Sequence, residues 1–291
     1  MIISKRTEIL FIYDVKDANP NGDPSDENKP RIDEESGINI VTDVRLKRTI
    51  RDYLYDYEGF NGETEKDIFV RQTTADKGGL NDGKGRANMF KGNDKKEMLN
   101  AILSKCIDIR LFGGVIPLDK DSITFTGPVQ FKMGRSLHRV EMKYIKGTGA
   151  FATTEGKSQQ GFREEYILPY SLIAFYGIVN ENAAKETQMT ENDLNLLIKA
   201  IWEGTRNLIT RSKFEHTPRL LMTLTHNQPE YFIGELNKYI KLNIKNGLRE
   251  EQIRDISDVE IDLSALKNKI NKADTQVQIR KDDRLTILNW E

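Results

Sequence analysis

The feature that most constrains this chain is a long polar loop between a strand pattern and a helix pattern near its start. Residues 9–15 are mostly apolar and predict a buried strand, and residues 43–57 have the spacing of an amphipathic helix. Between them, residues 19–24 have the sequence Asn-Pro-Asn-Gly-Asp-Pro, which favours turns over helix or strand. Elements of compact domains are usually joined by about two to six residues, so a loop of this length is expected to be functional.

The charges of the chain are nearly balanced but segregated along it. The formal net charge is −1. Residues 14–36 hold eight acidic and three basic residues, whereas residues 41–51 hold four basic residues and one acidic residue. Residues 132–163 hold seven basic and two acidic residues. This segregation predicts a groove for a polyanion on a nearly neutral protein; chance clustering on solvated faces is the alternative.

The first basic cluster falls on the predicted helix. At about 100° per residue, five apolar side chains share one face: Leu46, Ile50, Tyr53, Leu54 and Tyr57. Arg48 lies opposite this face, flanked by Arg45 and Arg51, so the helix is expected to present a row of guanidinium groups. Such groups suit phosphate oxygens. Asp43 is the predicted N-cap, which places the helix start at the end of the loop.

The second basic cluster lies between two predicted strands. Residues 123–131 alternate apolar and polar side chains, as in one strand with a single buried face, and residues 166–178 are apolar on both faces. The intervening residues 132–165 are polar and basic, with interleaved apolar and aromatic side chains. A projection of this kind can follow a nucleic-acid backbone and stack on its bases. A surface hairpin without a ligand is the alternative.

The remaining patterns complete an α+β order. Thr190 and Asp193 have capping-box spacing and open a helix whose apolar stripe runs to Ile209. Residues 219–225 predict a strand. Without its insertions the order is βαββαβ, the ferredoxin-like pattern of RNA-recognition domains. Residues 227–291 combine a helix pattern near Tyr231 with short strand-like pieces and are not assigned a place.

Two motifs resemble ligand sites but lack decisive residues. Residues 17–22 have the spacing that opens a calcium loop, but Asn28 stands where the bidentate glutamate is needed. Residues 78–84 have the spacing of a phosphate-binding loop, but Gly85 replaces the hydroxyl residue and no clear helix is predicted to follow. We therefore predict no metal site and no cofactor.

No catalytic residue is predicted. The chain has three histidines and shows neither a nucleophile elbow nor a two-histidine metal motif. Loop carboxylates are the exception, because one of them beside a metal ion could cut a phosphodiester: Asp17, Asp23, Asp26 and Asp33. A solvated turn is the alternative for these residues.

The single cysteine, Cys106, excludes an internal disulfide and a multi-cysteine metal site. It continues a helical apolar spacing and is predicted to be a packed core thiol. The longest apolar run is too short to span a bilayer, and the first residues lack the pattern of a signal peptide. We expect a cytoplasmic protein.

Several motifs resemble the CRISPR-associated Cascade backbone protein family of the RAMP superfamily. They lie in residues 13–24, 30–33, 41–48, 127–130 and 134–138 and in the strand that holds Pro169 and Tyr170. Within the family they are most similar to the type I-B form, and next to the type I-C form. The resemblance covers most of residues 7–226.

The resemblance implies a hand-like protein with a modified RNA-recognition palm. Its segments would be residues 1–58, 96–131 and 166–226 for the palm, 59–95 for a finger-like insertion, 132–165 for a thumb β-hairpin and 227–291 for a C-terminal extension. Such subunits stack head-to-tail along the CRISPR RNA and leave most of its bases free to pair with target DNA. The implied partners are other copies of the chain, the large subunit, the RAMP subunit that caps the 5′ handle and, indirectly, the helicase-nuclease.

Carried onto this chain, the resemblance assigns RNA contacts to nine residues. Phosphates would be held by Thr42, Arg45, Lys47 and Arg48. The RNA path would be lined by Asn19 and Asn21, and the thumb base would carry Met133, Arg135 and His138. A scaffold for any guide must recognise phosphates, 2′-hydroxyls and stacked bases rather than sequence. The alternative in the same superfamily is a metal-dependent RNase that cuts guide-paired RNA through Asp23 or Asp33.

Overall fold

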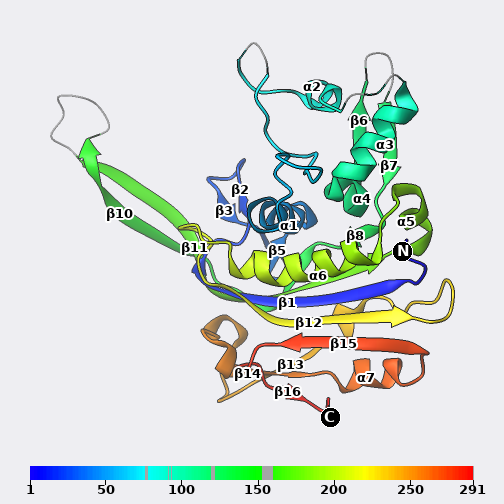
Figure 1. Ribbon diagram of the computed structural model, residues 1–291. Coiled ribbons are helices and arrows are strands. Elements are labelled where there is room, and N and C mark those ends of the chain that lie inside the picture. Colours follow the sequence, from blue (N-terminus) through cyan, green and yellow to red (C-terminus); the bar gives the residue numbers. More distant parts are fainter. Residues whose placement is uncertain (76–77, 91, 93, 119–121, 153–159, 291) are drawn as a thin grey trace.

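A large antiparallel sheet forms the centre of the computed structural model, which describes residues 1–290 except 76–77, 91, 93, 119–121 and 153–159 (Figure 1). In its middle, β1 (Thr7–Ala18) pairs with β11 (Gln160–Val179) on one side and β12 (His216–His226) on the other. The outer strands are β15 (Thr275–Lys281) beside β12, β8 (Val129–Phe131) and β9 (Gly134–Arg139) beside β11, and then β5 (Ile38–Val41) and β4 (Ile32–Asp33).

Two helices cover one face of this sheet. α1 (Asp43–Tyr57) and α6 (Glu191–Arg206) lie where the sequence predicts helices, and Thr190 and Asp193 form the predicted capping box. Alternate residues of β1 point toward these helices, because successive side chains of a strand point to opposite faces. The core between sheet and helices includes Ile9, Phe11 and Tyr13 of β1, Leu46, Ile50 and Leu54 of α1, and Leu197, Ile201 and Trp202 of α6.

Two details of this helical layer differ from the prediction. Ile209 lies beyond the end of α6 and is 67% exposed, so its assignment to the apolar stripe is wrong. The sequence pattern also misses α5 (Glu181–Thr187), a short helix before α6. No helix in the described part of the chain is both long and apolar enough to cross a membrane.

The residues on either side of β15, 227–274 and 282–290, pack against the opposite face of the sheet, below β12 and β15 in Figure 1. They contain β13 (Lys241–Ile244), β14 (Val259–Asp262), β16 (Ile287–Leu288), α7 (Ser264–Ile270) and the 3-10 turns η1 (Leu236–Tyr239), η2 (Glu250–Gln252) and η3 (Ile256–Asp258). Only η1 remains of the helix pattern near Tyr231, because Gly234 and Glu235 before it both have positive φ angles. The apolar core on this side includes Leu10 and Ile12 of β1, Leu172 of β11, and Leu236, Ile256, Ile261 and Leu266.

One buried carboxylate joins the C-terminal layer to the sheet. Glu8 of β1 is fully buried and accepts hydrogen bonds from the backbone N–H groups of Ile233 and Gly234, both at 2.7 Å. It also accepts one from the Tyr176 hydroxyl at 2.7 Å and lies 2.8 Å from Nε2 of His226. Burial alone would raise the pKa of Glu8, but these hydrogen bonds outweigh burial and lower it.

A third apolar cluster forms a module beyond the end of α1. It combines α2 (Gly83–Asn88), α3 (Lys95–Lys105), α4 (Ile107–Phe112) and a hairpin of β6 (Gly113–Pro117) and β7 (Ser122–Thr126). Cys106 is fully buried in this cluster, as predicted, and burial raises the pKa of its thiol. The apolar cluster of this module includes residues up to Phe125, beyond residue 95, where the sequence analysis expects a finger-like insertion to end; that insertion stays a prediction.

The alternating pattern of residues 123–131 belongs to two strands rather than one. β7 pairs with β6 in the hairpin, whereas β8 pairs with β11 in the sheet. The strand pairing is interrupted between them at Gly127. A Cβ atom at this position would lie 2.0 Å from the carbonyl carbon of Phe112, so only glycine fits there. Periodicity does not reveal this break, because the alternation of side chains continues through it.

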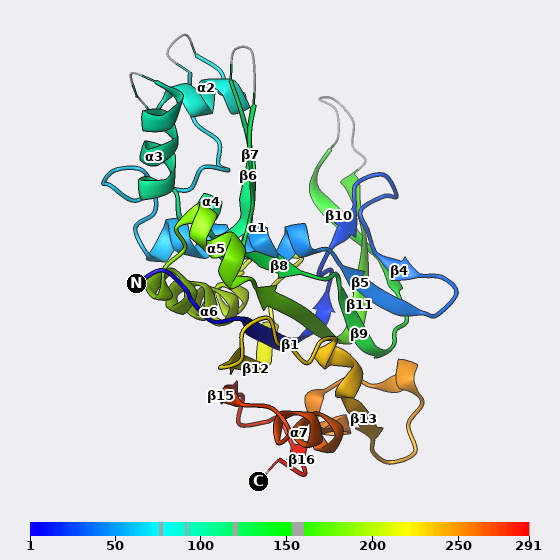
Figure 2. The ribbon, with the colours of Figure 1, turned by 90° about the vertical axis from the view of Figure 1, so that its right-hand side faces the viewer.

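A second projection is the hairpin of β10 (Lys143–Ala152) and the first part of β11. β9 lies in the sheet, so the projecting part begins later than residue 132, where the thumb was expected to start. The hairpin and the module of α2, α3, α4, β6 and β7, called the α2–α3 module below, both extend away from the sheet on the side of α1. α1 lies between them (Figure 2).

We predict that Glu8→Ala lowers the free energy of unfolding by about 3–5 kcal/mol, because it leaves four donors without their acceptor, two of them on the buried side chains of Tyr176 and His226. Denaturant unfolding followed by circular dichroism measures this loss. Glu186→Ala, which removes an exposed carboxylate from α5, is the control and is expected to have little effect.

The unmodified protein and Glu8→Ala are also expected to differ in how their free energy of unfolding depends on pH. The pKa of folded Glu8 lies below its ordinary value of 4.5, so its stabilisation is complete above pH 4.5 and is lost as the pH falls through the lowered pKa. Glu8→Ala lacks this component. Equal pH dependence of unfolding in the two proteins would contradict the role given to Glu8.

Candidate nucleic-acid interface

The long loop after β1 folds into two short hairpins. β2 (Gly22–Asp23) pairs with β3 (Lys29–Pro30), and β4 pairs with β5. The first hairpin requires a glycine, because a Cβ atom at Gly22 would lie 2.1 Å from Oδ1 of Asn28. The loop is therefore an ordered structure that leads the chain to the start of α1.

Asn21 fixes the start of α1. Its Oδ1 accepts hydrogen bonds from the backbone N–H of Thr42 at 2.8 Å and from the Thr42 hydroxyl at 2.9 Å. Thr42 is the N-cap, and its hydroxyl accepts from the backbone N–H of Arg45 at 3.2 Å. The prediction that Asp43 is the N-cap is wrong, because Asp43 is the first helical residue and binds Lys47 at 2.9 Å instead.

Asn19 holds the loop from the other side. It is 4% exposed, and its Nδ2 donates to the carbonyl of Asn28 at 2.6 Å. Its backbone N–H donates to the carbonyl of Ser212 at 2.8 Å, which brings residues 207–215 against the loop. Oδ1 of Asn19 has no hydrogen-bond partner among the described residues.

Two of the three arginines of α1 lie near the surface. Arg45 donates to the Thr49 hydroxyl at 3.0 Å and lies 3.8 Å from Asp52. Arg48 donates to the carbonyl of Val70 at 2.9 Å and binds the same Asp52 at 2.8 Å. These two guanidinium groups therefore share one half-exposed carboxylate, which leaves net positive charge at the start of α1.

The third arginine does not belong to an outward row. Arg51 is 11% exposed in its side chain and binds the buried Asp108 at 2.9 Å. Asp108 in turn accepts from the backbone N–H groups of Phe69 and Val70 at 2.7 Å and 3.0 Å. The expectation that Arg51 faces outward is wrong, because this arginine compensates a carboxylate that anchors the inserted module. Lys47 is also largely buried, against the ring of Phe112.

The three residues predicted at the thumb base occupy different environments. Met133 is 53% exposed, and the exposed Arg135 lies 3.9 Å from Asp33. His138 is 1% exposed: its Nδ1 donates to the carbonyl of Arg139 at 2.8 Å and its Nε2 accepts from the N–H of Leu172 at 3.2 Å. Burial lowers the pKa of His138. Its side chain cannot contact RNA without rearrangement and instead joins β9 to β11.

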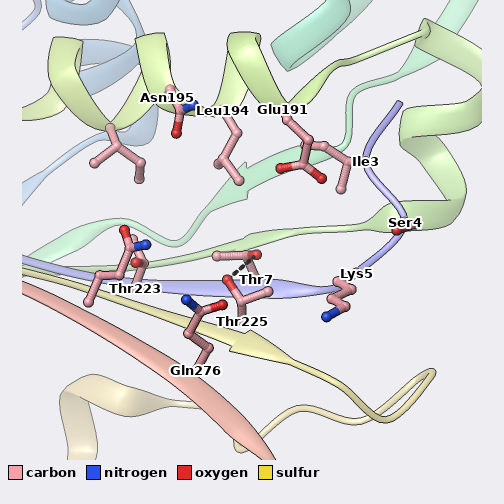
Figure 3. A pocket seen from close by; sticks show the side chains of 12 residues that line it. Ile3, Ser4, Lys5, Thr7, Glu191, Leu194, Asn195, Thr223, Thr225 and Gln276 are labelled. Carbon is pink, nitrogen blue, oxygen red and sulfur yellow. Dashed lines mark hydrogen bonds between the residues drawn. The ribbon is translucent and has the colours of Figure 1, made fainter. Parts of the chain in front are cut away.

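A groove of about 610 Å³ separates the loop from the base of the hairpin. Thr42 and Ile40 line it beside Met133 and Met142, and Asp26 and Lys29 belong to its charged rim. A second polar pocket of about 330 Å³ lies between α6 and the sheet (Figure 3). There the hydroxyls of Thr7 and Thr225 are 3.0 Å apart, and none of the nine predicted site residues lines it.

The loop carboxylates that could serve a nuclease are engaged in their own turns. Asp23 accepts from the N–H and hydroxyl of Ser25 and binds Arg31 at 2.6 Å, and these contacts, led by Ser25, lower its pKa. Asp33 accepts from the Ser36 hydroxyl at 2.8 Å, which also lowers its pKa. Within the described ranges, no three His, Cys, Asp or Glu side chains are grouped to hold a metal ion.

The glycine-rich motif of residues 78–84 is followed by a helix, contrary to the prediction. α2 begins at Gly83, and Asp82 caps it by accepting from the N–H of Gly85 at 2.7 Å. The helix start is therefore occupied by a carboxylate of the chain itself, which disfavours a phosphate at this position.

Comparisons with known proteins agree on one family. The family model for CRISPR-associated protein Cas7 matches residues 5–264. A protein of Haloferax volcanii named CRISPR-associated protein Cas7 is 32% identical over 297 residues, which cover 91% of this chain and 83% of the relative. The chain therefore belongs to the Cas7 family, which confirms the resemblance found in its sequence.

Solved structures support the same fold. A chain of a CRISPR RNA-guided surveillance complex has a TM-score of 0.51 at 12% identity, with 98% of this chain and 95% of that chain covered. A chain of such a complex in a pre-nicking state also has a TM-score of 0.51 at 12% identity, with 78% and 80% covered. The subtype stays a prediction.

We predict that Asn21→Ala lowers the free energy of unfolding by about 1–2 kcal/mol, since the N-cap residue Thr42 loses both of its hydrogen bonds to Oδ1 of Asn21. Asn21→Asp keeps an acceptor oxygen beside the helix start, where negative charge is favourable, and is expected to retain most of the stability. Denaturant unfolding of both variants tests this. If both variants lost the same free energy of unfolding, the acceptor oxygen of Asn21 would not be the source of the stabilisation.

Proposed function

We propose that the chain is the CRISPR RNA-binding backbone subunit of a type I Cascade surveillance complex, of the type I-B kind. Membership in the Cas7 family and the likeness to chains of CRISPR RNA-guided surveillance complexes support this role. The observation that carries the RNA-binding part is the start of α1. There Arg45 and Arg48 share a single carboxylate beside an ordered loop.

The topology supports an RNA-recognition type of palm. The strand order β12–β1–β11–β8, with α1 and α6 on one face, matches the order expected of a ferredoxin-like βαββαβ unit. Here, however, the face opposite the helices is covered by residues 227–274 and 282–290. RNA would therefore run along the α1 side, between the α2–α3 module as fingers and the β10–β11 hairpin as thumb (Figure 2).

In this proposal the predicted RNA contacts divide into two groups. Arg45 and Arg48 hold phosphates directly, while the exposed Met133 and Arg135 contact the RNA from the base of the hairpin. The second group consists of Asn19, Asn21, Thr42, Lys47 and His138, which position the loop, the helix start and β9. Recognition through phosphates and stacking would make binding tolerant of guide sequence.

Assembly follows from the same role. Head-to-tail contacts between copies are heterologous, so they would build an open filament whose length the guide limits. The guide would then be presented for pairing with target DNA, and the partners would be the large subunit, the 5′-handle-capping subunit and, indirectly, the helicase-nuclease. We propose no catalysis by this subunit, because Asp23 and Asp33 are held in turns by neighbouring hydroxyls.

Replacing Arg45 and Arg48 together by alanine is expected to weaken binding of unrelated single-stranded RNAs equally, by about 100-fold if each arginine holds one phosphate. The slope of log affinity against log salt should fall by about 1.4, since single strands contribute about 0.7 per phosphate. Lys185→Ala with Lys272→Ala removes two exposed charges elsewhere and is the control. Unchanged affinity and slope in the arginine variant would exclude the α1 site.

Purification from a host that expresses a CRISPR locus tests the role as a whole. We expect the chain to carry spacer-derived RNA of uniform length, because the guide limits the filament. Sequencing of the bound RNA measures this. If the recovered RNA had random sequence and length, the chain would be a general RNA-binding protein, and the backbone role would be contradicted.

A further inference from the structure

A second group of cations lies in the α2–α3 module, apart from the nine residues predicted to contact RNA. These cations line a pocket of about 390 Å³, many times the roughly 10–15 Å³ that one water molecule needs. Arg71, Arg86 and Lys105 supply three positive charges to its lining, and Asp67 supplies one negative charge. The described lining residues therefore carry a net charge of +2.

The two arginines of this pocket share the carboxylate of Asp67. Nε of Arg71 lies 2.7 Å from Oδ1 of Asp67, and Nη2 of Arg86 lies 2.6 Å from Oδ2. Arg86 is 4% exposed and also donates to the carbonyl groups of Ile68 and Phe69, so it is a fixed part of the wall. Arg71 is more accessible, with 19% of its side chain exposed. Direct contacts thus hold two guanidinium groups at one carboxylate, which leaves a positive charge at the pocket.

Lys105 adds a third positive charge, and its own partner is weakly held. Its backbone carbonyl accepts from the N–H of Asp67 at 2.9 Å, which fixes this end of α3 beside the two arginines. Its Nζ lies 2.9 Å from Glu65, whose side chain is 86% exposed. Exposed ion pairs contribute little and are screened by salt, so an anion in the pocket can replace Glu65 as the partner of Lys105.

Contacts connect this pocket to the cationic start of α1. Arg48 donates to the carbonyl of Val70, the residue before Arg71, at 2.9 Å. The guanidinium of Arg71 lies 5.7 Å from the ring centroid of Tyr55, which is 39% exposed. Tyr55 lies about two turns after Arg48 on the same face of α1, or about 10 Å farther along the helix axis. A strand bound at Arg48 can therefore reach Arg71 along this face.

We infer that this pocket is a second phosphate site, which takes a backbone phosphate of the RNA bound at α1. The inference rests on the proposed function and adds to it a site in the α2–α3 module. Arg71 and Lys105 hold the phosphate oxygens, because a guanidinium fork and an ammonium group both suit them. Arg86 positions Arg71 through the carboxylate that they share.

Arg71→Gln removes one of the two charges that hold the phosphate. Affinity of the full chain for a mixed-sequence single-stranded RNA should fall about ten-fold, and the slope of log affinity against log salt should fall by about 0.7. Arg71→Lys keeps the charge and should retain most of the affinity. Binding titrations at several salt concentrations measure both quantities. Unchanged affinity and slope in Arg71→Gln would overturn the inference.

Glu65→Gln separates a phosphate site from a purely structural role of these cations. It removes the exposed carboxylate that competes with the phosphate for Lys105, so RNA affinity should rise about two- to three-fold at low salt and less at high salt. Glu186→Gln removes an exposed carboxylate from α5 and is the matched control, which should change affinity little. If Glu65→Gln bound RNA no more tightly than this control, the inference would be wrong even if Arg71→Gln bound weakly.

The inference and the proposed function can fail separately. If Arg71→Gln binds RNA normally while the Arg45 and Arg48 double variant does not, the α1 site stands and only the site in the α2–α3 module is wrong. If neither variant changes affinity or salt slope, the proposed phosphate binding at α1 fails as well.

Discussion

The hydrogen bonds to Glu8 are the constraint on which the rest of the structure depends. One fully buried carboxylate in the central strand accepts donors from β11, from β12 and from the backbone that follows β12. A charge in this position is tolerable only because all of these donors are in place. The two core layers therefore form together, and the C-terminal residues belong to the fold rather than to an appendage.

That arrangement also decides which surface is left for a ligand. Tyr170 and Tyr176 of β11 point to the face that RNA-recognition domains use for stacking, but here their hydroxyls donate to Asp14 and Glu8 inside the protein. With this face covered, cationic groups on the helix side become the available surface. The exposed residues of α1 and of the hairpin base lie on that side, where the long loop ends.

The sequence predicts the elements whose periodicity is strong and misses those defined by tertiary contacts. β1, α1, β11 and α6 follow from apolar spacing and caps. The direction of Arg51 could not be predicted, because it depends on Asp108, which is distant in sequence. Residues 227–290 were not assigned, because short strands and 3-10 turns acquire their apolar pattern only by packing on the sheet. Family resemblance predicts a site at α1, but only contacts separate residues that face outward from residues that hold the loop and the helix start in place.

β11 is one continuous strand of 20 residues that serves the sheet with one part and the projecting hairpin with the other. A projection built on a separate loop could turn about its base, whereas this one shares its backbone and its twist with a strand of the central sheet. The direction in which the hairpin points is therefore set when the sheet folds. In the proposed filament, any contact that the hairpin makes with a neighbouring subunit would keep the direction that this one strand gives it.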